Sequence, residues 1–507
     1  MKRNKFYLIC GIICCICFAC SNFLTEYSHD QAYVQSYTDL DEMIIGSGYM
    51  KCNSASYNYG YTKNLVYYPY IHFMADETEV KTTGAYSYGN ADVPRILFGY
   101  YTWQKKVERD HEATVQWVEN QDWNNLYFHI NICNLILSQI DEQPVETEMD
   151  RQNVSRIKGE AYFLRGSYYF ILANLYGKPY VTATAKTDLA VPIKLTEYKE
   201  DKVYTRATVE EVYEQTLKDL LQAESYLRDI PRKSVTRAGH TAACLMLSRV
   251  YLYMQNYAET VKWARACLAE QNDLTNLNGF VGDAFVTQSS PELIFTMGGN
   301  FIFANLGNGA GNFVVSEDLV GCYTENDLRK RHFIRANDNG IYKYVKLSFA
   351  YDVRDVSDNF ALRTAEAYLN LAEAGACLGG EYVAESQNAY NVLRRNRITG
   401  YVDEHLTGED LIKAVRQERR RELCLEGHRW FDLRRYMVNE VCREEKTLFN
   451  TFVLYAWSDA DWEYVPTILR RYTLPPHDDA WTLPIPAVEL ESNYGMPDNP
   501  RAEREYK

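Results

Sequence analysis

Helical periodicity over two long stretches of the chain is the feature that most restricts its fold. Apolar residues recur every three or four positions from about residue 122 to 269, and again over 361–397, which is typical of helices with one buried face. Residues 240–269 and 361–397 each predict a helical hairpin, because a turn at 255–257 and at 379–380 divides the periodic run. Small alanines at facing positions let the two helices approach closely, as in tetratricopeptide repeats. These stretches are therefore expected to be α-helical.

Some helix ends can also be predicted. Gly177 and Pro179 end the helix expected over 153–177, since both residue types interrupt helices. Thr208 is a candidate N-cap for a helix that runs to about residue 228. Long aromatic-rich loops, irregular in structure, are expected between the helices, because their aromatic content argues against disorder. These loops cover about 50–105, 297–323 and 450–482.

The composition is that of a folded globular protein. Of the 507 residues, 46% are apolar and 24% are charged. The formal net charge is −14 and no basic stripe is present, so nucleic acid is not an expected partner. Tyrosine is unusually frequent, at 42 residues against 20 phenylalanines. Because tyrosine combines an apolar face with a polar tip, this excess suits either a surface that binds sugar or peptide, or a tyrosine-rich core.

The first twenty residues predict export and a lipid anchor. Three basic residues precede an uninterrupted apolar run over 6–19, which is typical of a secretory signal and too short to span a membrane. The run ends in Ala19-Cys20, which resembles a bacterial lipobox, so Cys20 is the expected lipidation site. Cleavage without lipid is the alternative. We therefore expect a lipoprotein signal peptide over 1–19 and a mature chain, 20–507, held at the membrane by acyl chains.

No motif for metal, cofactor or catalysis is present. The eight cysteines after Cys20 include no CxxC pair, so neither a zinc site nor a redox site is indicated, and several occupy apolar helix positions typical of buried thiols. The nine histidines are isolated, and no HExxH, GxSxG or P-loop motif occurs. We expect no cofactor, no bound metal and no catalytic residue.

Five segments of the chain carry a family resemblance. They are CSNFL at 20–24, KGEAYFLRGSYYFILANLYGKPY at 158–180, RTAEAYLNLAEA at 363–374, ERRRELCLEGHRWFDLRRY at 418–436 and LPIPAVELESNYGMPDNP at 483–500. Together they resemble the SusD/RagB family of bacterial outer-membrane lipoproteins. The resemblance implies a mainly α SusD-like fold with four tetratricopeptide-like helix pairs and a loop-rich, irregular ligand-binding half. It also implies a single domain over 20–507, into which the three aromatic loops are inserted.

Charged residues are dense between 418 and 434. Glu418, Glu422 and Glu426 share one helix face by their spacing, and arginine pairs with carboxylates through two parallel hydrogen bonds. This pattern predicts an interior ion-pair network that holds helices together, rather than an active site. The network is expected to include Glu418, Arg419, Arg421, Glu422, Glu426, Arg429, Asp432 and Arg434, with Arg165, Arg363, Glu366 and Glu373 in the same structural role.

The resemblance implies a non-enzymatic protein on the extracellular side of the outer membrane. Such a protein binds an oligosaccharide or polysaccharide and delivers it to a SusC-like TonB-dependent transporter. Capture of peptides or glycopeptides is the rival interpretation. A surface hydrolase is a third, and for a glycosidase it needs two carboxylates about 5–10 Å apart in a cleft.

Aromatic loop residues are the expected ligand contacts, because the C–H faces of sugars stack on aromatic rings while amides and charged groups bind the hydroxyls. A place in the core is the alternative for each of them, and Trp123 and Trp430, on strongly patterned helices, are assigned to the core outright. The candidates are Tyr86, Tyr88, Asn90, Tyr100, Tyr101, Trp103, Asn300, Phe301, Phe303, Asn305, Trp457 and Trp462.

Overall fold

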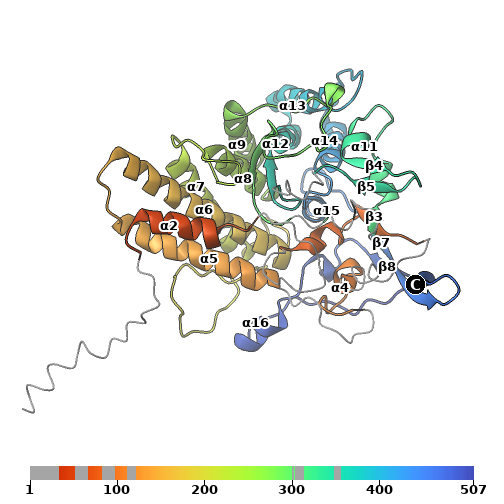
Figure 1. Cartoon of the computed structure of the whole chain (residues 1–507), viewed down its shortest axis with the longest axis horizontal. Helices are drawn as coiled ribbons and strands as arrows, with labels where there is room; N and C mark the ends of the chain where they lie inside the picture. Colours follow the sequence, from red (N-terminus) through yellow and green to blue (C-terminus); the bar gives the residue numbers. More distant parts are fainter. Residues whose placement is uncertain are drawn as a thin grey trace, which may run out of the picture.

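The computed structural model describes residues 34–51, 67–82, 97–110, 121–299, 302, 306, 313–347 and 356–507. The predicted signal peptide and Cys20 lie outside these residues. Helices make up most of the regular structure and strands are few, so the mainly α fold is confirmed (Figure 1).

Both predicted helical hairpins are present. The first is formed by α8 (His240–Tyr253) and α9 (Tyr257–Glu270), and the second by α12 (Thr364–Leu378) and α13 (Val383–Arg395). The other helices are α2 (Tyr37–Met43), α4 (Phe98–Tyr101), α5 (Gln121–Gln139), α6 (Glu148–Tyr176), α7 (Val209–Leu227), α10 (Glu317–Val320), α11 (Arg329–His332), α14 (Gly408–Glu422), α15 (Arg429–Met437) and α16 (Ala487–Ser492).

Local signals in the sequence set the helix ends. Thr208 caps α7 as predicted: its hydroxyl accepts a hydrogen bond from the Glu211 N–H at 3.2 Å, and the Glu211 carboxylate accepts from the Thr208 N–H at 2.8 Å. Gly177 ends α6, also as predicted. Helix α6 begins earlier than expected, at Glu148, because Thr147 forms a second capping box with Asp150.

The long helices pack on one another in chain order. Helix α5 packs on α6, α6 on α7, α7 on α8 and α8 on α9, and α12 then contacts α9, α13 and α14. A separate apolar cluster fills the space between α9, α12, α13 and α14. In Figure 1 these helices occupy the left and upper parts of the molecule, and the labelled strands lie on the right.

The described strands form four antiparallel pairs, of which the last is the longest. The prediction of an irregular loop over 450–482 is wrong, because most of this segment is a regular hairpin. The base of the hairpin places Phe452, Val453 and Tyr472 in the core. The pairs are β1 (Thr78–Val80) with β3 (Phe313–Val315), β2 (Leu293–Thr296) with β6 (Ala361–Arg363), β4 (Ile334–Ala336) with β5 (Tyr342–Tyr344), and β7 (Leu448–Ser458) with β8 (Glu463–Leu474).

The hairpin of β7 and β8 projects from the right side of the molecule in Figure 1. Its base is tied to the rest of the fold, since the Asn450 side-chain amide donates a hydrogen bond to the Tyr101 carbonyl at 2.7 Å. Its far end therefore stands out from a fixed base. No helix within the described ranges is long and apolar enough to cross a bilayer.

Candidate functional site

Three of the predicted ligand residues lie in the core. Tyr100, Tyr101 and Trp103 are each at most 1% exposed. The Tyr100 ring stacks on that of Tyr70 with centroids 3.9 Å apart, and the Trp103 indole N–H donates to the Met74 carbonyl at 3.0 Å. Because no face of these rings reaches solvent, they are not available for stacking on a sugar, and we correct their assignment to the core.

Seven other candidates fall outside the described residues and stay predictions. They are Tyr86, Tyr88, Asn90, Asn300, Phe301, Phe303 and Asn305. The assignment of Trp123 and Trp430 to the core is confirmed, since they are 2% and 1% exposed.

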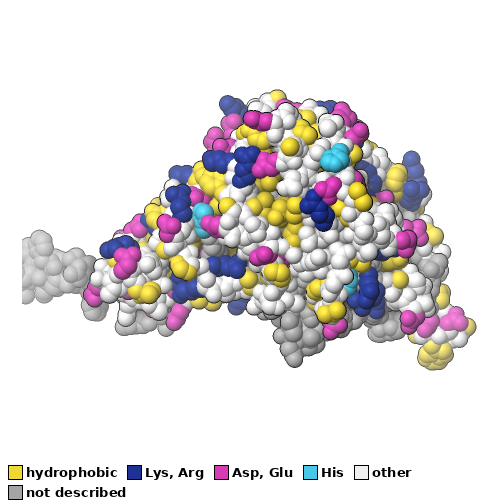
Figure 2. All heavy atoms as spheres, turned by 90° about the horizontal axis from the view of Figure 1, so that it is seen from above, with side chains coloured by type: hydrophobic (Ala, Val, Ile, Leu, Met, Phe, Trp, Pro, Cys, Tyr) yellow, Lys and Arg dark blue, Asp and Glu magenta, His cyan; other side chains and the backbone are white. Residues whose placement is uncertain are grey.

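Trp457 and Trp462 lie at the far end of the β7–β8 hairpin, in a segment that we call the tryptophan tip (residues 457–464). Trp457 is 41% exposed and Trp462 is 78% exposed. Their rings stand nearly perpendicular, with centroids 6.3 Å apart, and the Tyr464 ring lies 5.3 Å from that of Trp457. Figure 2 shows hydrophobic atoms beside acidic ones at this projecting end, on the right of the view. The tip thus presents clustered aromatic rings to solvent.

Hydrogen bonds within the turn fix the shape of the tip. The Trp462 N–H donates to the Ser458 carbonyl at 2.9 Å, and the Ser458 hydroxyl donates to the Asp461 carboxylate at 2.8 Å. The Trp457 indole N–H donates to the Asp459 carboxylate at 2.9 Å, which sets the orientation of its ring. Trp462 has a φ of 55°, a left-handed conformation that is strained for a residue with a side chain. Exposed aromatic rings on a strained backbone are typical of binding sites.

Carboxylates surround the two tryptophans, and the sequence analysis missed them. Asp459, Asp461 and Glu463 are all exposed and alternate with the aromatic residues along the turn. The segment WSDADWEY, in which acidic residues lie between aromatic ones, is the sequence signal that could have revealed them. Carboxylates accept hydrogen bonds from hydroxyl groups, so the tip combines stacking surfaces with hydrogen-bond acceptors.

A groove of about 590 Å³ lies at the base of the same hairpin. The Arg470 guanidinium is 4.5 Å from the centroid of the Tyr506 ring, and the Tyr472 ring meets that ring at 6.0 Å. Cationic and acidic side chains are mixed along its walls, so the groove favours no single charge class of ligand. Its lining is Phe98, Gln104, Lys106, Arg109, Asp110, Arg470, Tyr472, Glu503, Arg504, Glu505 and Tyr506.

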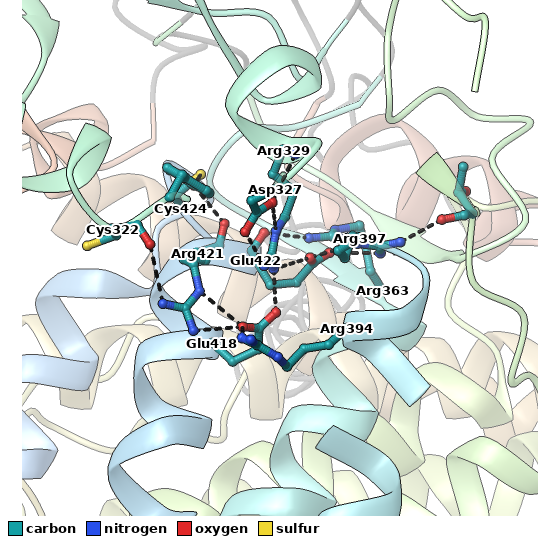
Figure 3. A network of polar contacts seen from close by, with 12 residues as sticks. Cys322, Asp327, Arg329, Arg363, Arg394, Arg397, Glu418, Arg421, Glu422 and Cys424 are labelled. Carbon is teal, nitrogen blue, oxygen red and sulfur yellow. Dashed lines mark hydrogen bonds and ion pairs between the residues drawn. The ribbon is translucent and has the colours of Figure 1, made fainter. Parts of the chain in front are cut away.

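The charged residues around 418–434 form a buried network, as predicted (Figure 3). Arg363 contacts Glu422 at 3.0 Å and Glu426 at 2.7 Å, and Arg397 contacts Glu422 at 2.8 Å. Arg329 contacts Glu418 at 2.7 Å. Except for Glu426, which is 4% exposed, these side chains are fully buried. The network joins β6, α11 and the segment after α13 to α14.

Further pairs extend the network along the helices. Arg165 pairs with Asp219, Arg249 with Glu366, and Arg435 with Glu373, at 2.7, 2.6 and 2.6 Å. The remaining predicted members are also engaged: Arg419 contacts Asp432 at 2.9 Å, Arg421 contacts Glu418 at 2.8 Å, and Arg429 contacts Asp76 at 2.7 Å.

Arg434 differs from the prediction, because it pairs with backbone carbonyls rather than with a carboxylate. Its guanidinium donates to the carbonyls of Asn174 and Gly177 at the end of α6. Burial lowers the pKa of Arg434 to about 10. Arginine at a helix C-terminus satisfies carbonyls that have no partner within the helix, so Arg434 docks α15 on the end of α6.

The charges of the network stabilise the fold and do not form a reactive site. Burial by itself raises the pKa of Glu422, but Arg397 and Arg363 outweigh it and hold the pKa well below its ordinary value. Burial and then the nearby Arg249 and Arg419 lower the pKa of His428 well below its usual range. Glu422 is therefore ionised, paired with arginine and closed to solvent, so a substrate has no access to it.

In the part of the chain that the structure describes, no group of three or more His, Cys, Asp or Glu side chains is arranged to hold a metal ion. The described cysteines are free thiols, buried or partly buried.

The comparisons with known protein families identify the chain. A family model described as starch-binding and associating with the outer membrane matches residues 69–252, and the SusD family model matches residues 336–501. The chain belongs to the SusD/RagB-like family. No curated protein matches this SusD-like chain.

Solved structures share the fold of this SusD-like protein. A SusD superfamily protein from Bacteroides thetaiotaomicron is 21% identical, with 92% of this chain and 100% of that chain covered and a TM-score of 0.67. A putative sugar-binding protein from Bacteroides vulgatus is 23% identical, with 93% and 99% covered and a TM-score of 0.66. A laminarin-binding SusD-like protein is 19% identical, with 92% and 100% covered and a TM-score of 0.61.

Proposed function

We propose that this SusD-like protein is a cell-surface lipoprotein that binds an oligosaccharide or polysaccharide and delivers it to a SusC-like TonB-dependent outer-membrane transporter. The description of the matched family as starch-binding and associated with the outer membrane supports this role. The observation that carries it is the tryptophan tip, where two indole rings are exposed at the end of a projecting hairpin and that of Trp457 is held by a hydrogen bond to Asp459.

Stacking is the main source of binding energy in this proposal. Trp462 offers an open ring face, and Trp457 and Tyr464 form a second surface beside it. An aromatic contact contributes about 0.5–1.5 kcal/mol beyond the burial of its area, so a single site would bind with a Kd in the high micromolar range. Repeated units of a polymer would raise the affinity through avidity. The protein would then act as a lid over the transporter, releasing the ligand by a hinge motion.

Capture of peptides or glycopeptides for the same kind of transporter is the second candidate. The groove at the hairpin base favours it, because mixed charges beside Tyr472 and Tyr506 suit a ligand with both an amine and a carboxylate. A peptide ligand would make affinity depend on sequence or chain ends rather than on sugar linkage. A hydrolase would convert its ligand, so analysis of products distinguishes it from both binding roles.

The test is calorimetry of recombinant residues 21–507 with polysaccharides, oligosaccharides and peptides, with product analysis for every ligand bound. Trp462→Ala is expected to weaken glycan binding at least tenfold while the Tm stays unchanged, because the ring is 78% exposed. Phe449→Ala is the matched control, since Phe449 is 52% exposed on the same hairpin but outside the tip. Equal glycan binding by both variants and the wild type would contradict a role for the tip.

A further inference from the structure

We infer that the tryptophan tip selects uncharged, hydroxyl-rich glycans over glycans that carry carboxylate or sulfate groups. The inference rests on the proposed function and names its ligand class. It concerns the three carboxylates beside the rings, Asp459, Asp461 and Glu463, which the stacking argument does not use.

The tip carries three acidic side chains within residues 459–463. All three carboxylates are exposed, and none of them has an ion-pair partner among the described residues. The sequence contains no lysine or arginine between Lys446 and Arg470. The pattern elsewhere in the fold is the opposite, since the carboxylates of the buried network each contact arginine. An anionic ligand stacked on Trp462 would therefore be repelled by these carboxylates.

Hydrogen-bond chemistry leads to the same ligand class. A carboxylate accepts hydrogen bonds and cannot donate them, whereas a sugar hydroxyl can donate. Asp459 uses one oxygen for the Trp457 indole, and Asp461 uses one for the Ser458 hydroxyl. No described residue donates to the second oxygen of either aspartate or to Glu463, so these oxygens can accept from ligand hydroxyls. Carboxylate and sulfate groups of a ligand also only accept, so they would leave these oxygens unpaired.

The experiment compares neutral polysaccharides with their own charged derivatives, so that the sugar backbone is held constant. The probes are laminarin, starch and xylan, each unmodified and carboxymethylated, titrated at low salt and at 1 M NaCl. We expect the neutral form of any bound glycan to bind about tenfold more tightly at low salt. The difference in affinity between the neutral and the carboxymethylated form should become smaller at 1 M NaCl, where charges are screened beyond about 3 Å.

The decisive variant removes the charge and keeps the shape. Asp459→Asn with Asp461→Asn and Glu463→Gln should bring the two forms to within about twofold of each other. The amide oxygens still accept from Trp457 and Ser458, so the turn is retained. The matched control removes three exposed acidic charges elsewhere, by Asp283→Asn, Glu381→Gln and Glu491→Gln, and should leave the discrimination unchanged.

The outcomes separate the inference from the proposed function. If the wild type binds a neutral glycan, and binds its carboxymethylated form equally or more tightly, the inference is overturned while glycan capture stands. The same holds if the tip variant discriminates as the wild type does. If no probe binds, or if Trp462→Ala has no effect on binding, the proposed role of the tip fails and the inference fails with it.

Discussion

Trp103 has no exposed surface, whereas Trp462 is 78% exposed, although both lie in aromatic-rich segments of similar composition. The hydrogen bonds of the two tryptophans reflect this difference in exposure. The Trp103 indole N–H donates to the Met74 carbonyl inside the core, while the Trp462 backbone closes a turn in solvent. At the scale of single residues, exposure separates the aromatic rings that hold the fold from those that can meet a ligand.

Trp103→Ala is expected to lower the free energy of unfolding by about 3–5 kcal/mol, because it removes a large buried ring and leaves a cavity. Urea unfolding followed by circular dichroism measures this change. Trp462→Ala in the same assay should leave the free energy of unfolding within about 0.5 kcal/mol of the wild type. A small effect of Trp103→Ala would show that this ring is not part of the core.

Glu373 gives the ion-pair network a pH dependence. Burial by itself raises the pKa of Glu373, but Arg435 and Arg416 outweigh it and lower the pKa to about 2. Because this folded-state pKa lies below the unfolded value of about 4.3, the stabilisation is fully present above that value and is lost as the pH falls toward 2.

Glu373→Gln should therefore destabilise the protein by about 3 kcal/mol at pH 7, since two buried arginines lose their shared carboxylate and keep only Asp432 and Glu444. The difference in the free energy of unfolding between variant and wild type should become smaller as the pH falls below about 4.3. Urea unfolding at pH 7, 5, 4 and 3 tests both expectations. Glu381→Gln, at an exposed position, is the control and should follow the wild type at every pH. If the difference in the free energy of unfolding does not change with pH, the charge of Glu373 does not stabilise the fold.

At the scale of elements, each long helix carries its own start signal. Thr208→Ala removes the acceptor for the Glu211 N–H and should cost about 1 kcal/mol in the free energy of unfolding. Thr208→Ser keeps the hydroxyl and should restore most of this stability. Thermal and urea unfolding of the two variants provide the measurement, and equal stability of both would argue against the cap.

The helices and the buried network could be predicted because their signals are local. Periodicity placed α8, α9, α12 and α13, and the spacing of Glu418 and Glu422 on one helix face indicated ion pairs. Tertiary contacts decide whether an aromatic side chain is buried or exposed. Composition therefore could not show that Tyr100 is buried and Trp457 is exposed. The β7–β8 hairpin was missed because Pro466 and a bulge beside Leu454 interrupt the alternation of a strand.

The whole molecule has its N-terminal helix and its tryptophan tip on different sides. Figure 1 shows α2 with the long helices on the left, while the β7–β8 hairpin projects on the right along the longest axis. The start of the described fold and the tryptophan tip are therefore separated along the longest axis of the molecule.

Cys20→Ser is expected to release the protein from membranes, because the acyl chains that we propose for Cys20 would be its only covalent anchor. The test is fractionation of cells that lack the transporter, since the transporter could retain the variant. Cys322→Ser, at a partly exposed cysteine of the folded region, is the control and should stay with the membrane fraction. A Cys20→Ser variant that sediments with membranes in these cells would argue against acylation at Cys20.

The tryptophan tip has one further consequence, because residues 459–462 form an exposed turn that contributes no side chain to the hydrophobic core. Mutations there escape the strong stability constraint that acts on buried positions. Sequence changes in the turn can therefore accumulate without loss of the fold. The same independence makes the turn a practical grafting position for laboratory libraries.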